Sequence, residues 1–153
     1  MAGEKYLIFE VCNRKFSLEF ADIKIITAGE KPQPIPDFPE YVLGTIVNEE
    51  QIVPVIDLRR RFHYEVKELT DRDCIIITNG ERPVGLIADF IDGFCEVESE
   101  KIQPAPNLNS DASARFIKGE FLDGDSPCYV LDGEKVIKAE DSGLFEVIEN
   151  SGT

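Results

Sequence analysis

Short apolar runs with a two-residue period recur along most of the chain, and they limit what it can fold into. Alternation of apolar and polar residues over about four to eight positions is typical of β-strands with one buried face. At residues 15–20, for example, Phe16, Leu18 and Phe20 alternate with polar residues, which predicts a strand with one face in water. We expect strands at residues 6–11, 15–20, 23–27, 42–47, 52–56, 74–78, 83–88, 90–97, 101–103, 116–122 and 127–131. The chain is therefore predicted to be all-β.

Polar reversals separate several of these runs at the spacing of β-hairpins. Asn13-Arg14, Asn79-Gly80 and Asp123-Gly124-Asp125 each lie between two apolar runs, as does the tetrad Asn48-Glu49-Glu50-Gln51. Turn-forming residues between two alternating runs favour antiparallel pairing of neighbouring strands. We therefore expect most sequential strands to pair as hairpins.

The chain contains a faint internal repeat with two different offsets. Shifting the sequence by 68 residues places the hairpin of residues 6–20 on that of residues 74–88, and a shift of 75 places 55–57 on 130–132. Similar units with unequal internal loops would give this pattern. We expect two tandem five-stranded β-barrels of the SH3-like size class, which share a hydrophobic core.

The remaining segments are predicted to be irregular, apart from one short helix. Four prolines between residues 29 and 39 exclude a central strand and predict an extended surface loop. Residues 134–139 are compatible with a short C-terminal helix, and residues 140–153 with an acidic tail. We expect a single folded domain at residues 1–139, and an N-capping role for Asp57 before a helical turn.

The charge of the chain restricts its partners. Thirty acidic and 16 basic residues give a formal net charge of −14, which repels nucleic acid and anionic lipid. The small basic cluster Arg59, Arg60 and Arg61 does not offset this field. The sequence contains no membrane-length apolar window and no signal-peptide pattern at its start, so we expect a cytoplasmic protein whose four cysteines are free thiols.

The sequence offers little for catalysis. His63 is the single histidine, and the paired carboxylates are what thirty acids in a short chain would give by chance. The segment Asp123-Gly124-Asp125 lacks the further ligands of a calcium loop. We expect no catalytic residue, no metal and no cofactor; a small-molecule-binding barrel pair is the alternative in another class.

A protein-binding surface is the better-supported expectation. Two adjacent barrels leave a groove at their junction, and apolar side chains on strand edges would line it. The candidates are Ile23, Ile25, Ile26, Val47 and Leu86. Because Ile25 and Ile26 are adjacent in a strand, one of them must point away from its own barrel, unless the proline loop covers it.

In the following motifs the chain resembles the chemotaxis coupling proteins of the CheW type. The matching segments, in order, are Phe16-Ser17-Leu18-Glu19-Phe20 with Ile23, the proline loop to Pro36, Gly44, Pro54-Val55-Ile56-Asp57-Leu58-Arg59, Val84-Gly85-Leu86-Ile87-Ala88-Asp89, Ile102-x-Pro104-x-Pro106 and Ile117-Lys118-Gly119. The resemblance implies two SH3-like five-stranded barrels and a non-catalytic adaptor. It also implies that the adaptor joins the hairpin tip of methyl-accepting chemoreceptors to the regulatory domain of a CheA-type histidine kinase.

The resemblance also implies which residues meet these partners. Ile23 and its strand would line the groove for the receptor tip, and the second barrel, around residues 85–94 with Gly85 and Leu86, and around Gly119, would supply kinase or array contacts. An adaptor for a histidine kinase outside chemotaxis remains an alternative with the same fold.

This chain departs from the family pattern at the tip of one hairpin. Where the family has Asn-Leu-Arg-Gly, the chain has Val47-Asn48-Glu49-Glu50, so a glutamate replaces the usual arginine. Ile25 stands where the family tends to place the glutamate that pairs with that arginine, so both charges of the pair are expected to be missing. Because charge at a recognition tip decides which partner is repelled, we expect Glu49 and Ile25 to mark altered partner preference.

Overall fold

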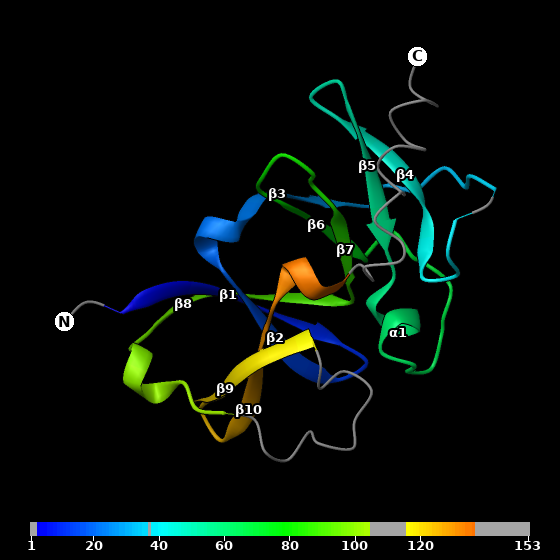
Figure 1. Cartoon of the computed structure of the whole chain (residues 1–153). Coiled ribbons are helices and arrows are strands. Elements are labelled where there is room, and N and C mark those ends of the chain that lie inside the picture. Colours follow the sequence, from blue (N-terminus) through cyan, green and yellow to red (C-terminus); the bar gives the residue numbers. More distant parts are fainter. Residues whose placement is uncertain (1–2, 37, 105–115, 137–153) are drawn as a thin grey trace.

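The computed structural model describes residues 3–36, 38–104 and 116–136, which form ten β-strands and a few short helical turns. The first sheet has the order β8-β1-β2-β10-β9, and the second has the order β3-β6-β7-β5-β4 (Figure 1). The first contains β1 (Glu4–Val11), β2 (Arg14–Glu19), β8 (Phe90–Val97), β9 (Ile117–Asp123) and β10 (Ser126–Leu131). The second contains β3 (Ile23–Ala28), β4 (Val42–Asn48), β5 (Gln51–Ile56), β6 (Cys74–Thr78) and β7 (Gly85–Ala88). The helical turns are η1 (Phe20–Asp22), α1 (Leu58–Arg61), η2 (Ser99–Lys101) and η5 (Gly133–Val136).

The two five-stranded barrels are therefore confirmed, and the internal repeat explains their strand orders. If β1 to β5 are matched to β6 to β10, the order of the first sheet becomes the order of the second. Each barrel takes a hairpin from one repeat and three strands from the other. In a simple tandem arrangement, each half of the chain would form a barrel of its own. Here neither half does.

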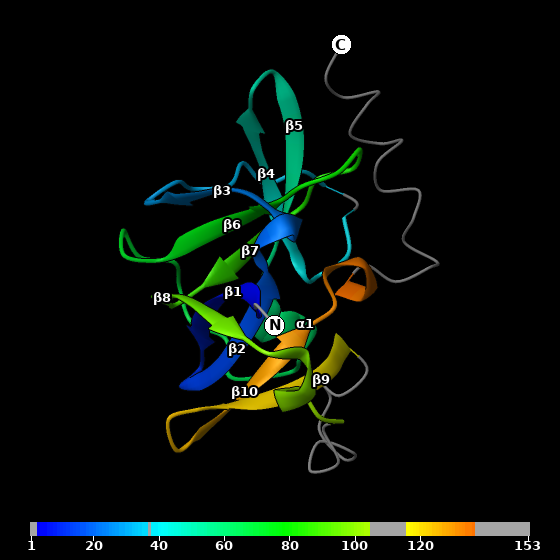
Figure 2. The same ribbon diagram turned by 90° about the vertical axis from the view of Figure 1, so that its left-hand side faces the viewer.

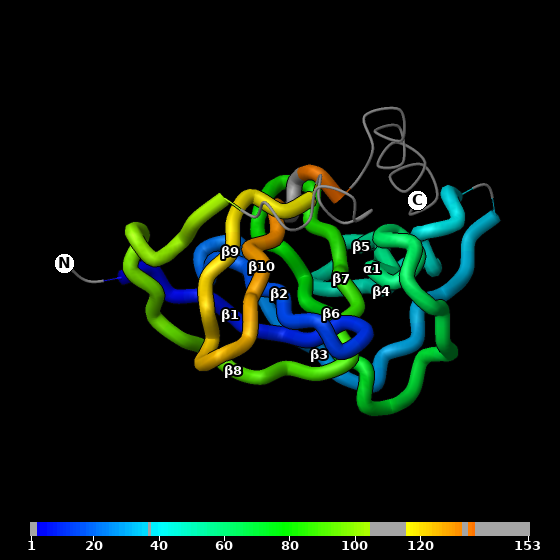
Figure 3. The backbone as a smooth tube through the Cα atoms, turned by 90° about the horizontal axis from the view of Figure 1, so that it is seen from below, coloured from blue at the N-terminus to red at the C-terminus, as the bar shows by residue number. Residues whose placement is uncertain are grey.

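Two crossings of the chain produce this exchange. After β2, η1 leads into β3 of the second sheet, and after β7, Asp89 leads into β8 of the first. Figure 2 shows the two barrels one above the other, and Figure 3 shows β1 and β2 between β8 on one side and β9 and β10 on the other. Hairpin pairs are antiparallel. Of the pairs between the two repeats, β1 with β8 and β3 with β6 are antiparallel, whereas β2 with β10 and β5 with β7 are parallel.

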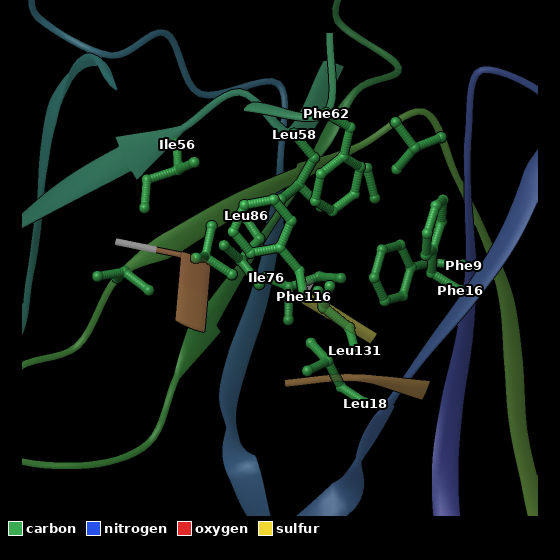
Figure 4. Packing of buried hydrophobic residues seen from close by; sticks show 14 of the residues in the cluster. Phe9, Phe16, Leu18, Ile56, Leu58, Phe62, Ile76, Leu86, Phe116 and Leu131 are labelled. Atoms are coloured by element: carbon green, nitrogen blue, oxygen red, sulfur yellow. The ribbon is translucent and has the colours of Figure 1, made fainter. Parts of the chain in front are cut away.

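The buried side chains form three clusters, one inside each barrel and one that joins the two barrels. The interior of the first barrel includes Tyr6 and Ile8, and that of the second includes Val53 and Ile75. The third and largest cluster lies between the barrels and contains the other face of β1 (Figure 4). Its members shown there are Phe9, Phe16, Leu18, Ile56, Leu58, Phe62, Ile76, Leu86, Phe116 and Leu131.

Side chains on both faces of β1 and β2 are buried. The prediction that residues 15–20 form a strand with one face in water is therefore partly wrong. Ser17 is fully buried. Its hydroxyl lies 3.5 Å from the Tyr129 carbonyl, on the strand that pairs with β2 in parallel. The first turn also differs from the prediction: it lies at Cys12 and Asn13, both with positive φ, one residue earlier than Asn13-Arg14.

The proline loop is confirmed as irregular and is pinned to the second barrel. Gln33 and Thr45 exchange two backbone hydrogen bonds of 2.8 and 2.9 Å. Gly44, beside Thr45, has φ of +154°, and a Cβ there would lie 2.3 Å from the Gln33 carbonyl oxygen. Only glycine allows the loop to approach β4 this closely.

Two predicted helical features have different outcomes. The capping role of Asp57 is confirmed, since its side chain accepts a hydrogen bond from the Arg59 amide at 2.9 Å. The short C-terminal helix begins as the 3-10 turn η5 (Gly133–Val136), and the rest of residues 134–139 lies outside the described residues. The expected tail at 140–153 and the predicted loop at 107–114 also lie outside them.

Candidate partner-binding surface

The open edge of the second barrel carries the residues that the sequence singled out on β3 and on the β4–β5 hairpin. β3 and β4 are the two outer strands of this sheet. An ion pair of 2.8 Å between Lys24 Nζ on β3 and Glu49 Oε2 at the hairpin tip joins the edges. We call Ile25, Val47 and Glu49 together the β3-edge surface.

On β3, the two adjacent isoleucines point to opposite sides, as predicted. Ile26 is half-buried and packs against the core between the barrels, as does Ile23. Ile25 is 45% exposed, although its strand neighbour on β6, Ile77, is buried. The proline loop therefore leaves Ile25 accessible, and the alternative in which it covers this face does not hold.

The tip of the β4–β5 hairpin projects an apolar and two acidic side chains. Val47 is 67% exposed, although it lies within β4. Glu49 and Glu50 have φ of +50° and +67°, a left-handed conformation that glutamate rarely adopts. The side chain of Glu49 is anchored by Lys24, whereas Glu50 forms no ion pair with any other described residue.

The expectation that both charges of the family pair are missing needs correction. A cation and an anion still meet between β3 and the tip, with Lys24 on the strand and Glu49 on the hairpin. The pair is thus present with its signs exchanged and shifted by one residue on β3. Sequence reasoning compared Ile25 alone and overlooked its neighbour.

Two of the predicted contact residues lie in the interior. Leu86 is fully buried in the core between the barrels, and Gly85 is buried beside it. A Cβ at Gly85 would lie 2.7 Å from Ile75 Cγ2. Both residues therefore shape β7 from inside, and neither offers a side chain to a docked partner.

An exposed aromatic pair lies on the first barrel; the predicted contact region at 85–94 includes Phe94, but the sequence did not reveal its partner Phe20. The rings of Phe20 and Phe94 meet edge to face with centroids 5.4 Å apart, and both are about half exposed. The ammonium of Lys5 lies 4.7 Å from one ring and 5.0 Å from the other, a cation–π geometry. The signal was the spacing of Phe90 and Phe94, which places both on one face of β8.

The basic cluster at 59–61 is structural, not a binding patch. Arg59 is fully buried, with its Nε 3.0 Å from Asp57 Oδ1 and its Nη1 3.4 Å from Asp89 Oδ1. Asp89 Oδ2 accepts a hydrogen bond of 2.8 Å from the Cys12 amide. This network joins α1, the β7–β8 crossing and the β1–β2 turn, and so fixes one barrel against the other.

Arg61 is also removed from the surface. Its Nε donates to the Val136 carbonyl, and its guanidinium lies over the rings of Phe116 and Tyr41, at 4.3 and 4.7 Å from their centroids. Only Arg60 of the three is partly exposed. The buried arginines Arg59 and Arg61 therefore do not offset the negative charge of the surface.

The described residues also include metal-ligating side-chain types and four cysteines. No group of three or more His, Cys, Asp or Glu side chains among them has the geometry to hold a metal ion. The four cysteines are free, and burial raises the pKa of the Cys12, Cys74 and Cys95 thiols and that of Cys128 to about 12. Thiols with raised pKa values are weak nucleophiles at neutral pH. No described helix has the length and apolar character needed to cross a membrane.

The fold is a strand-exchanged pair of five-stranded barrels with an exposed apolar edge, and comparison with known proteins gives its family. The CheW-like domain model matches residues 5–141. The chain is 32% identical over 105 residues to the chemotaxis protein CheW of Bacillus subtilis, covering 68% of this chain and 67% of the relative. It is 25% identical over 150 residues to CheW of Klebsiella aerogenes, covering 97% and 90%.

A solved structure agrees with the fold. The scaffolding protein TtCheW of Thermoanaerobacter tengcongensis superposes with a TM-score of 0.82 at 22% identity, over 92% of this chain and 91% of that one. The two barrels therefore have the fold of this scaffolding protein. The chain belongs to the CheW-like family.

Proposed function

We propose that this chain is a non-catalytic adaptor that links chemoreceptors to the regulatory domain of a chemotaxis histidine kinase in the cytoplasm. Membership of the CheW-like family is the observation that carries the proposal. The exposed apolar residues of the β3-edge surface support it, because accessible apolar anchors with a polar rim are typical of protein-binding sites. Ile23 and Ile26 hold β3 on the core beneath this surface.

The β3-edge surface is the proposed docking site for the receptor hairpin tip. Ile25 and Val47 would supply the apolar anchors, and Glu50 would face the partner with a negative charge. Glu49 would contribute less, because Lys24 already neutralises it at 2.8 Å. The partner of this divergent member is therefore expected to carry a basic or neutral residue where it meets the tip.

Binding measurements on two purified partners test the adaptor role. The dissociation constants for a candidate kinase regulatory domain and for a receptor tip fragment are measured by calorimetry, first alone and then together. A Val47→Ser variant is expected to weaken receptor binding about 5-fold or more, because it removes an exposed anchor. Val66→Ser, which alters another half-exposed valine outside the surface, is the matched control.

Charge variants test the altered preference separately. Glu50→Arg is expected to change receptor affinity more than Glu49→Arg combined with Lys24→Glu, which restores an ion pair of the opposite polarity. Normal affinity that is indifferent to both changes would remove the altered-preference idea. Failure to bind any regulatory domain of a chemotaxis kinase would remove the adaptor role in chemotaxis and leave another kinase pathway or a small ligand.

A further inference from the structure

A groove of about 890 Å³ opens on the first barrel, between the end of β8, the turn η2 and β9. Figures 1 and 2 place this end of the molecule opposite the tip of the β4–β5 hairpin. The groove is therefore separate from the β3-edge surface. Nothing in the proposed adaptor function uses it.

The walls of the groove are the edges of two strands. β8 and β9 are the outer strands of the first sheet. Consecutive residues of each strand line the groove, at 95–98 and at 120–123, as expected where strand edges and not faces form a wall. Within the described chain, the single backbone bridge to this side of β9 is that of Gln103 with Glu120. An unpaired strand edge is a template for an added extended segment.

The floor of the groove is apolar. Val97 and Phe121 belong to the buried interior of the first barrel and close the groove from below. Leu122 stands at its side and is 71% exposed, the highest value among the large apolar side chains of the described residues. An extended segment lying here would cover Leu122 with an apolar side chain of its own.

The rim of the groove is strongly negative. Five carboxylates line it against one lysine, Lys101; the acids are Glu96, Glu98, Glu100, Glu120 and Asp123. One of them is partly neutralised, because Lys15 Nζ lies 2.8 Å from Asp123 Oδ2. The remaining charge repels acidic partners and attracts a cationic one.

We propose that this groove binds a positively charged, extended peptide segment of a partner protein. The segment would add to a free strand edge through its backbone, place an apolar side chain on Leu122 and lay basic side chains along the rim. The C-terminal tail of this same chain does not match the charge of the groove, because residues 137–153 contain four acidic residues and one lysine. A second copy of a chain with a net charge of −14 is disfavoured on the same ground.

A cysteine in the groove provides a direct assay. The probe is a short, fluorescently labelled peptide of alternating lysine and valine, and its affinity is measured by anisotropy. Maleimide labelling of the native protein, followed by mass spectrometry, then gives the modification rate of each thiol. The peptide is expected to slow modification of Cys95, which lines the groove, and to leave Cys12 and Cys74 unchanged. Equal protection of the three thiols, or none at Cys95, would overturn the proposal.

Matched variants separate the groove from the general acidic field. The double variant Glu96→Gln with Glu98→Gln is expected to lower the affinity for the peptide about 5-fold or more. The reason is that each exposed ion pair changes affinity by up to roughly 5-fold. Glu65→Gln with Glu68→Gln removes two exposed acids elsewhere and should leave affinity unchanged. Leu122→Ser should weaken binding and Val66→Ser should not. Equal losses in both charge pairs would mean diffuse attraction only and would refute the groove as the site.

Discussion

The buried network around Arg59 allows a sharp test of how the two barrels are held together. Asp89→Asn keeps the acceptor for the Cys12 amide but removes the negative charge beside Arg59 Nη1. Breaking a buried ion pair from one side costs about 3–5 kcal/mol. Asp57 still pairs with Arg59 at 3.0 Å, and Asp89 is 15% exposed near Lys67. The lower end, about 3 kcal/mol, is therefore expected.

Urea denaturation followed by circular dichroism measures this loss. For a chain of this size, each kcal/mol of lost unfolding free energy lowers Tm by about 2–4 °C. The Asp89→Asn substitution should therefore lower Tm by about 6–12 °C. The m-value should stay constant, since the folded and unfolded surfaces are unchanged. Lys67→Met is the control: this lysine pairs with Asp89 at 3.6 Å but is half exposed, so its loss should cost under about 1 kcal/mol.

A double-mutant cycle separates the charge effect from packing. Arg59→Met removes the buried cation, so adding Asp89→Asn to it should cost less than Asp89→Asn alone, by at least about 1 kcal/mol. Additive free energies of unfolding would refute the reasoning. So would an Asp89→Asn protein within about 0.5 kcal/mol of the parent chain.

Two further predictions concern the proline loop and a carboxyl pair. Gly44→Ala should destabilise the fold by about 3 kcal/mol or more, because the new Cβ meets the backbone of Gln33. Gly80→Ala, with φ of +139° but open space around it, should cost only the backbone strain, and equal losses in urea titrations would contradict the clash. Burial and a hydrogen bond with Asp92 raise the pKa of Glu10. The folded state thus holds a proton that the unfolded state has lost, so stability falls as pH rises above about 4.5, the ordinary glutamate value. Glu10→Gln should remove this fall in stability above the ordinary glutamate pKa, and an unchanged curve would exclude Glu10 as its cause.

Most strand positions could be predicted from the sequence because the two-residue period reports them directly. The short strand expected at 101–103 is wrong, since Ser99–Lys101 form the turn η2 and Gln103 makes only an isolated bridge. The periodicity does not say which strands become neighbours. Sheet partners such as β1 and β8 lie more than 80 residues apart, and only tertiary packing pairs them. The offsets of the internal repeat contained the relation between the sheets, but an exchange of strands leaves the same offsets as two separate barrels.

The candidate site was predictable where adjacent residues decide it and not where distant ones do. Ile25 and Ile26 cannot share one side of a strand, so one of them was expected to leave the interior of its barrel; the structure shows that it is Ile25 and that it is exposed. The pairing of Lys24 with Glu49 depends on the closure of the second barrel, which no local pattern reports. The burial of Arg59 was missed for a related reason, since a charged cluster is exposed by default unless its partners are known.

The exchange of strands between the repeats also determines how this protein can come apart. Neither the segment up to β5 nor the segment from β6 onward contains all the strands of one barrel. Neither segment can therefore keep a complete sheet when the other unfolds. Loss of order in either half of the chain removes two strands from one barrel and three from the other. The molecule should therefore melt in one cooperative step despite its two interiors. It should also fold slowly, because Ser17 must find Val130 near the far end of the described chain before the first sheet is complete.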